Sequence, residues 1–211
     1  MPTVALIGPE LFPIPPIRGG ATELFIDRLA AHLSRYQPVV MGPADPELPD
    51  QEMRGRVAYQ RVPLNAWQKW LYRRYRHLVP LYDRGVAKLV RRLGPDLLHV
   101  HNRPLLALNL KTWFPRLPVL LHMHNTYHIL GKRERPAPYT PMPVEAFLAC
   151  SNFVMEEERD RLCRCAFFLP CVGFVRATAR RPYCCELSWP EYGHAGRSTN
   201  AKYGCYQSGF P

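Results

Sequence analysis

A pair of adjacent glycines between a strand-like and a helix-like segment constrains the fold more than any other feature of the sequence. Residues 3–8 are aliphatic and bounded by Gly and Pro, which predicts a strand buried on both faces. Residues 24–33 carry apolar side chains at helical spacing. Gly19 and Gly20 precede this helix, where a close backbone approach, free N–H groups and the helix dipole favour an anion such as phosphate. A plain tight turn is the alternative, because the segment matches neither the dinucleotide-binding nor the Walker A pattern.

The alternation of strands and helices continues along the chain. Short apolar runs predict further strands at residues 38–42, 57–62, 96–102, 118–125 and 146–150. Helical patterns cover residues 66–78, the segment from there to about 93, residues 104–114, and the segment after Ser151 or Asn152. The Pro- and acid-rich residues 43–52 are expected to form a loop. This alternation predicts the α/β class with a doubly wound, Rossmann-like parallel sheet.

Two of the predicted strands end in histidine and asparagine. Parallel α/β sheets bind ligands at the carboxyl ends of their strands, so His101, Asn102, His124 and Asn125 are candidates for a binding site. Sugar hydroxyls both donate and accept hydrogen bonds. Neutral imidazole and amide groups match that requirement.

The spacing of the histidines leaves a metal site open as an alternative. His99 and His101 share one face of a strand, as do His122 and His124, and His128 follows nearby, so a metal-dependent hydrolase could be built on them. A hydrolytic metal site also uses carboxylates, and no Asp or Glu lies between His99 and His128 in the sequence. We therefore expect no metal ligands here, and we expect His99 and His122 to be hydrogen-bonded core residues.

The net charge of +11 is concentrated in one part of the chain. Between residues 61 and 92 there are nine Lys or Arg residues and one acid, Asp83, interleaved with Trp and Tyr. Residues 67–92 therefore suit peripheral contact with an anionic membrane, whereas a nucleic-acid surface and a solvated basic helix pair are the other interpretations. We expect no nucleic-acid partner. Without a signal-peptide pattern or a run of roughly 18 apolar residues, the expected location is cytoplasmic, including the inner face of the membrane.

Four motifs follow one another over roughly residues 1 to 162: P-P-x-R-G-G-A-x-E at 15–23, D-L-L-H-V-H-N-R-P at 96–104, L-H-M-H-N at 121–125, and A-C-S-N-F-V at 149–154. Together they resemble the amino-terminal domain of family 4 glycosyltransferases of the bacterial spore-coat polysaccharide type. The resemblance implies a two-domain GT-B enzyme of cell-envelope or spore-coat polysaccharide synthesis. Such an enzyme transfers a sugar from a nucleotide-diphosphate sugar to a glycan or other acceptor, with retention of configuration. No cofactor beyond that substrate is implied.

On the donor side, the resemblance implies roles for four residues. The backbone N–H groups of Gly19 and Gly20 would lie near the donor phosphates. Arg18 and Glu23 would flank this loop. Oriented amides and a helix N-terminus stabilise the charge of a departing nucleotide diphosphate.

On the sugar side, the resemblance implies that His124 is the catalytic residue near the reacting carbon and that Asn125 contacts the sugar with it. Asn102 and Arg103 would line the acceptor side, and His101 lies beside them on the strand end.

The composition changes after Leu162. Six of the seven cysteines follow this residue, and residues 163–211 contain no Asp and no sustained helical or strand periodicity. The second domain of the family binds the nucleotide sugar through two glutamates eight positions apart, and this chain has no such pair. We therefore expect residues 1–162 to form the acceptor-side domain, and residues 163–211 to be a poorly ordered tail that is out of frame. The chain would then lack the donor-binding domain and be inactive alone. A zinc site is the alternative, but the cysteine spacings are not C-x2-C.

Overall fold

The computed structural model describes residues 1–68, 70, 81–126, 144–155 and 168–170. The chain divides into two compact units, Met1–Thr178 and Ala179–Pro211. All of the described residues belong to the first unit. Of the predicted tail, residues 163–211, only residues 168–170 are described.

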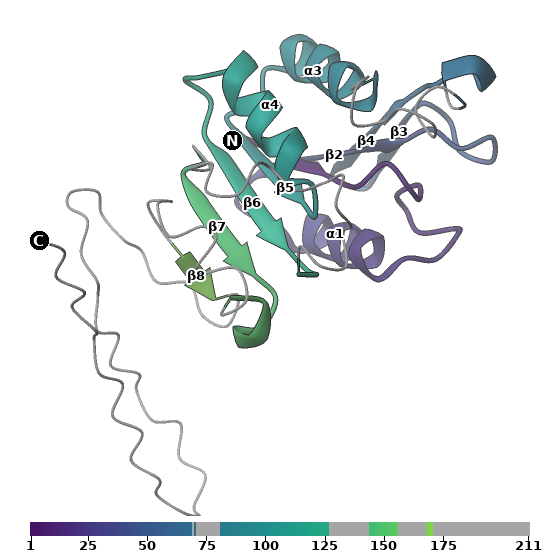
Figure 1. Cartoon of the computed structure of the whole chain (residues 1–211). Coiled ribbons are helices and arrows are strands. Elements are labelled where there is room, and N and C mark those ends of the chain that lie inside the picture. Colours follow the sequence, from purple (N-terminus) through teal and green to yellow (C-terminus); the bar gives the residue numbers. More distant parts are fainter. Residues whose placement is uncertain (69, 71–80, 127–143, 156–167, 171–211) are drawn as a thin grey trace, which may run out of the picture. The chain divides into compact units, whose positions relative to one another are not determined.

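The first unit is built on an eight-stranded sheet with the order β3-β4-β2-β1-β5-β6-β7-β8 (Figure 1). The strands are β1 Thr3–Ile7, β2 Gln37–Pro43, β3 Gln51–Arg54, β4 Val57–Val62, β5 Leu97–His101, β6 Val119–Met123, β7 Ala146–Ala149 and β8 Phe168–Pro170. Neighbouring strands pair in parallel except β3 and β4, which are antiparallel. The chain winds outwards from β1 in both directions. This arrangement confirms the predicted α/β class and doubly wound sheet.

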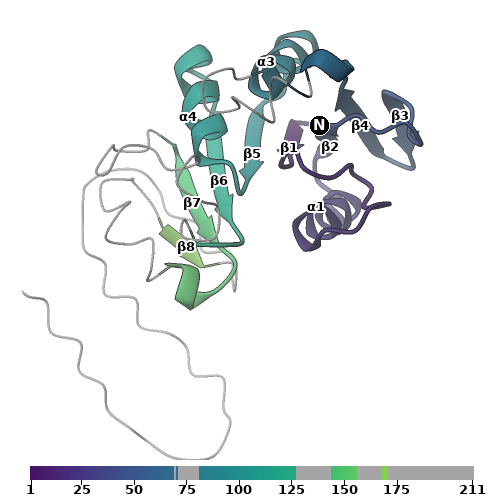
Figure 2. The ribbon, with the colours of Figure 1, turned by 45° about the vertical axis from the view of Figure 1, so that its right-hand side comes forward.

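Helices cover both faces of the sheet. Helix α1, Ala21–His32, lies on one face, and α3, Leu81–Leu93, and α4, Pro104–Trp113, lie on the other (Figures 1 and 2). On the first face, Ile26 of α1 packs in a cluster with Leu6 of β1 and Val40 of β2. The larger cluster, on the face of α3 and α4, contains these buried residues: Ala5, Ile7, Val39, Met41, Val62, Tyr82, Val86, Ala87, Val90, Leu98, Val100, Leu106, Ala107, Leu110, Val119, Leu121, Met123, Val144, Phe147, Ala149 and Val154. Burial on both faces explains the continuous apolar runs of the inner strands.

Two elements differ from the prediction at their boundaries. Strand β3 occupies the end of the predicted 43–52 loop and joins β4 through Gly55, whose φ is +58°. Its side chains are mostly exposed and polar, so it has no apolar periodicity to reveal it. Helix α1 begins at Ala21 instead of residue 24. The predicted start was too late because the first turn contains the polar Thr22 and Glu23, which do not contribute to an apolar pattern.

The remaining helices agree with the prediction where they are described. Residues 66–68 and 70 are helical, and the rest of the predicted 66–78 helix lies outside the described residues. Ser151 caps the helix at residues 152–155, because its Oγ accepts a hydrogen bond from the N–H of Val154 at 3.3 Å. Among the described residues, no helix is long and apolar enough to cross a membrane.

Strand β8 corrects part of the expected irregular tail. Phe168–Pro170 pairs in parallel with β7, extending the sheet by one strand. Three residues are too few to produce a periodic pattern, so sequence periodicity could not detect this strand.

Candidate functional site

The glycine loop lies beyond the carboxyl end of β1 and leads into α1. Gly19 and Gly20 have φ values of +85° and +107°, which L-amino-acid side chains rarely adopt. Both glycines are exposed, and Gly20, the N-cap residue of α1, has no side chain with which to cap the helix. The N–H groups of its first turn, which helix geometry leaves unpaired within the helix, are therefore a favourable environment for an anion.

Glu23 lies behind this loop instead of at its surface. The residue is 4% exposed, and burial raises the pKa of its carboxyl, against the opposing effect of a hydrogen bond from its own backbone N–H. A side chain on Gly20 would collide with this carboxylate.

Arg18 is paired with carboxylates that follow β2. Its guanidinium lies 3.1 Å from Asp45 and 2.5 Å from Glu47. The charge of Arg18 is thus balanced within the protein. Its expected contact with donor or acceptor stays a prediction.

Asn102 connects three parts of the site. It directly follows β5 and has a φ of +53°. Its Nδ2 donates a hydrogen bond to Thr22 Oγ1 of α1 at 3.0 Å, and its Oδ1 accepts hydrogen bonds from the backbone N–H groups of His124 at 2.7 Å and Asn125 at 3.2 Å. The side chain is buried, so its polar groups serve contacts inside the protein.

Arg103 belongs to a buried ionic network. Its guanidinium is paired with Glu10 and, at 3.2 Å, with Asp83, and it lies 5.9 Å from the centre of the Tyr82 ring. Asn109 donates a further hydrogen bond to Asp83 at 2.8 Å. The Arg103 side chain is 7% exposed, so the structure assigns it to the packing of α3 and α4, and its expected place on the acceptor side stays a prediction.

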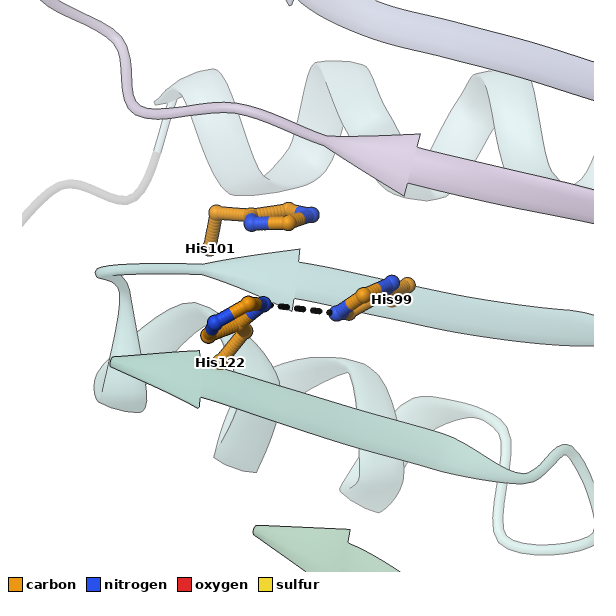
Figure 3. Close-up of side chains that lie close together, drawn as sticks. All are labelled: His99, His101 and His122. Atoms are coloured by element: carbon orange, nitrogen blue, oxygen red, sulfur yellow. Dashed lines mark hydrogen bonds between the residues drawn. The ribbon is translucent and has the colours of Figure 1, made fainter. Parts of the chain in front are cut away.

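Four histidines form a stacked cluster on the α1 face of β5 and β6. The Nε2 of His99 lies 3.3 Å from the Nδ1 of His122, and the Nδ1 of His101 lies 3.0 Å from the Nε2 of His124 (Figure 3 shows the first three residues). Phe25 of α1 packs against the cluster, with its ring centre 4.7 Å from that of His124. The prediction that each pair shares a strand face, with His99 and His122 as hydrogen-bonded core residues, is confirmed.

These imidazoles are neutral near pH 7. Burial lowers the pKa of His124 to about 4, that of His99 to about 3 and that of His122 to about 2. Burial also holds the pKa of His101 well below 6.5. A neutral imidazole donates one hydrogen bond and accepts another, so the cluster matches the polarity of a hydroxyl group.

The metal alternative can be compared with this geometry. Ligand atoms of His99, His101 and His122 lie within 4.8 Å of one another, and the buried Nε2 of His101 has no hydrogen-bond partner. This group contains no carboxylate among the described residues. A buried divalent cation would be held by neutral ligands alone, and no ligand would compensate its charge. His128 lies outside the described residues. The described contacts of these imidazoles are with one another and with Phe25, and the expectation that they bind no metal stays a prediction.

The predicted sugar-side residues differ in their access to solvent. His101 is fully buried and can act on a ligand only through His124. His124 and Asn125 are partly exposed, so they can touch a ligand directly.

Two residues of the site were missed by the sequence analysis. Thr22 anchors Asn102, and Phe25 packs on the imidazoles. A threonine after a glycine pair carries no signal for a contact eighty positions away, and Phe25 reads as an ordinary core residue of an amphipathic helix.

A surface hollow lies next to the glycine loop, because Asp45 in its wall is the ion-pair partner of Arg18. It is lined by Ala44, Asp45, Pro46, Leu48, Asp50, Pro63 and Leu64. Two carboxylates in its wall make it a poor site for phosphate.

Comparison with curated proteins finds two relatives in Bacillus subtilis (strain 168). The chain is 32% identical to YtcC, a glycosyltransferase by name, over 123 residues, which are 58% of this chain and 26% of that protein. It is 28% identical to spore coat protein SA over 123 residues, or 58% of this chain and 29% of that protein. The chain therefore spans little more than a quarter of the length of these relatives.

Solved structures share the fold. Sucrose-phosphate synthase from Thermosynechococcus elongatus superposes with a TM-score of 0.57 and 12% identity, covering 81% of this chain and 47% of the synthase. A second structure of that synthase gives a TM-score of 0.55 and 13% identity over 80% of this chain and 87% of the other.

The family assignment comes from the sequence itself. The model for Glycosyltransferase Family 4 matches residues 19–164, which include the glycine loop, the ends of β5 and β6, and Ser151. This match covers more than half of the chain. The chain belongs to glycosyltransferase family 4.

Proposed function

We propose that this chain is the acceptor-side half of a retaining glycosyltransferase that takes its sugar from a nucleotide-diphosphate sugar. The observation that carries the proposal is the pairing of two chemically different surfaces. An uncapped helix N-terminus with two exposed glycines lies beside the partly exposed His124 and Asn125, and Asn102 hydrogen-bonds to both sides.

The two surfaces suit the two parts of such a donor. The N–H groups around Gly19 and Gly20 would stabilise the negative charge that develops on the departing nucleotide diphosphate. The neutral His124 would hydrogen-bond to the sugar near the reacting carbon, with Asn125 beside it. A glycan acceptor would approach from the side of Asn102 and Arg103.

The proposal includes the process in which the enzyme acts and its location in the cell. One relative is named as a spore coat protein, which supports a role in cell-envelope or spore-coat polysaccharide synthesis. The proposed location is cytoplasmic, at the inner face of the membrane. There the exposed Trp67 and the basic face of α3 would contact anionic lipid.

Saturation-transfer difference NMR on the full chain tests the donor side. UDP-glucose, GDP-mannose and a panel of cell-wall oligosaccharides are offered one at a time, and inorganic pyrophosphate serves as the competitor. We expect at least one nucleotide sugar to bind and pyrophosphate to displace it. If neither the nucleotide sugars nor the oligosaccharides give a signal, the proposal fails.

We also propose that the sequence from about residue 163 is out of frame, since its composition changes abruptly after Leu162. On this proposal a transferase assay of the chain alone gives no turnover. The nucleotide sequence downstream of the Leu162 codon decides the matter. An alternative frame should encode a second α/β domain with two glutamates eight positions apart, and its absence from both alternative frames would refute the frameshift.

A further inference from the structure

We propose that Asn102 is a positioning residue that couples the glycine-loop side of the site to the His124 side. The role in positioning a ligand rests on the proposed function, but the coupling between the two sides of the site can be tested separately. Asn102 was expected to line the acceptor side. Its geometry points to a different task, because its buried amide is engaged by α1 and by the end of β6.

The contacts of Asn102 with β6 fix the backbone of the sugar side. The backbone N–H of Asn102 donates to the carbonyl oxygen of His122 at 2.9 Å. Its Oδ1 then accepts the N–H groups of His124 and Asn125 at 2.7 and 3.2 Å. Three hydrogen bonds from one residue therefore define where the chain leaves β6.

The contact with α1 fixes the phosphate side. The Nδ2 of Asn102 donates to Thr22 Oγ1 at 3.0 Å, and Thr22 is the second residue of α1, directly after Gly20 and Ala21. Both side chains are buried, so this hydrogen bond is shielded from water. A displacement of the helix start is thereby transmitted to the backbone of His124.

The backbone conformation favours asparagine at this position. A φ of +53° is tolerated by Gly and Asn, and unfavourable for most other side chains. An amide also supplies an acceptor for two N–H groups and a donor for a hydroxyl, which neither Gly nor Leu can do. The neighbouring His101 adds a contact to the ring of His124 at 3.0 Å, so the last residue of β5 holds the ring of His124 and the residue that follows it holds the backbone.

Amide hydrogen exchange in the full chain tests the coupling. Asn102→Gly removes the side chain and keeps the permitted φ, whereas Thr22→Val removes only the hydroxyl partner and Thr22→Ser retains it. We expect T22V to accelerate exchange of the His124 and Asn125 amides by about tenfold, the effect of losing one buried hydrogen bond. N102G removes three side-chain hydrogen bonds and should accelerate exchange more, and T22S should leave it unchanged.

Val86→Ala controls for general loss of stability, because Val86 packs in the cluster on the opposite face of the sheet. It should leave the exchange of these two amides, relative to global unfolding, as in the wild type. If T22V behaves like V86A, Asn102 supports its local turn only and the coupling is refuted. T22V suffices for this decision if N102G does not fold.

Titration with inorganic pyrophosphate separates this inference from the proposed function. If pyrophosphate shifts the Gly19 and Gly20 amides of the wild type, T22V should weaken that binding several-fold, with T22S unchanged. Failure of pyrophosphate to bind the wild type counts against the proposed function and leaves the exchange result to decide the coupling. Accelerated exchange in T22V with undiminished pyrophosphate affinity would overturn the positioning role while keeping the contact.

Discussion

The two glycines of the loop are not equivalent at the level of single residues. Both have positive φ, but a Cβ on Gly19 would meet open space, whereas one on Gly20 would meet the carboxylate of Glu23. We therefore expect Gly19→Ala to cost about 1 kcal/mol of unfolding free energy from backbone strain alone. Gly20→Ala should cost about 2 kcal/mol or more, because steric collision adds to the strain. Urea denaturation of the two variants measures the difference, and equal losses would show that Glu23 moves aside.

The buried imidazoles make stability depend on pH. Because burial lowers the pKa of His124 to about 4 and that of His99 to about 3, the unfolded chain binds more protons than the folded chain below pH 6.5. Stability is complete above pH 6.5 and should fall as the pH decreases towards 4. Glu23 has the opposite effect on the pH dependence of stability. Burial raises the pKa of its carboxyl, so its contribution to stability is present at low pH and is lost as the pH rises. Because the ordinary pKa of this carboxyl is 4.5, the effect begins at the acidic end of the range.

Urea midpoints at several pH values between 7.5 and 4.5 check this prediction. The double variant His99→Leu/His122→Leu should show a flatter profile, because two of the buried bases are gone. His32→Asn is the matched control, since His32 is exposed, and its profile should follow that of the wild type. A wild-type midpoint that is constant across this range would contradict the assignment of neutral imidazoles.

At the level of whole elements, the sequence predicted the strands that are buried on both faces of the sheet and missed two strands, one exposed and one very short. Strands β1, β2, β5 and β6 were found from continuous apolar runs. Strand β3 was missed because it is polar and exposed, and β8 because it is short.

The candidate site shows the same limit. Glycines and strand-end histidines are local signals, and the structure brings them together beyond the carboxyl ends of β1, β5 and β6. The contact between Asn102 and Thr22 spans eighty positions, and the ionic partners of Arg103 lie on other elements. Such contacts depend on tertiary packing, which periodicity and spacing do not encode.

Helix α3 carries the described cations of the predicted membrane surface. Its exposed cations are Arg84, Lys88, Arg91 and Arg92, which recur at helical spacing on one face. Arg91 lies over the Phe114 ring, and Arg92 donates to Gln60, so Arg84 and Lys88 are the better choices for substitution.

We expect Arg84→Ser/Lys88→Ser to weaken binding to phosphatidylglycerol vesicles by about tenfold or more, at about 1 kcal/mol per cation near the surface. Co-sedimentation measures the affinity. Arg28→Ser/Arg35→Ser changes the net charge equally at exposed positions on another part of the surface and should have a smaller effect. Equal losses in both double variants, or equal binding to phosphatidylcholine, would show that no specific face is involved.

The whole unit has two separate cores, one on each face of the sheet. Ile26 of α1 lies in one and Leu110 of α4 in the other, and both side chains are fully buried. Replacement of either by Ala should cost about 2–5 kcal/mol, from lost burial and the cavity left behind.

The double variant Ile26→Ala/Leu110→Ala should lose the sum of the two single losses to within about 0.5 kcal/mol, because distant sites without shared partners are additive. Chemical denaturation of the four proteins measures this cycle. A coupling much larger than that would mean that the sheet deforms and transmits strain between its faces.

Strand β3 has a consequence for how molecules of this protein meet one another. It forms the outer edge of the sheet, and its Glu52 is paired with Arg54 at 2.5 Å and with Arg61 at 2.8 Å. A second chain that added a strand here would have to strip water from these ion pairs, and charged edges of this kind discourage such pairing. This edge is therefore protected against the edge-to-edge stacking from which fibres grow.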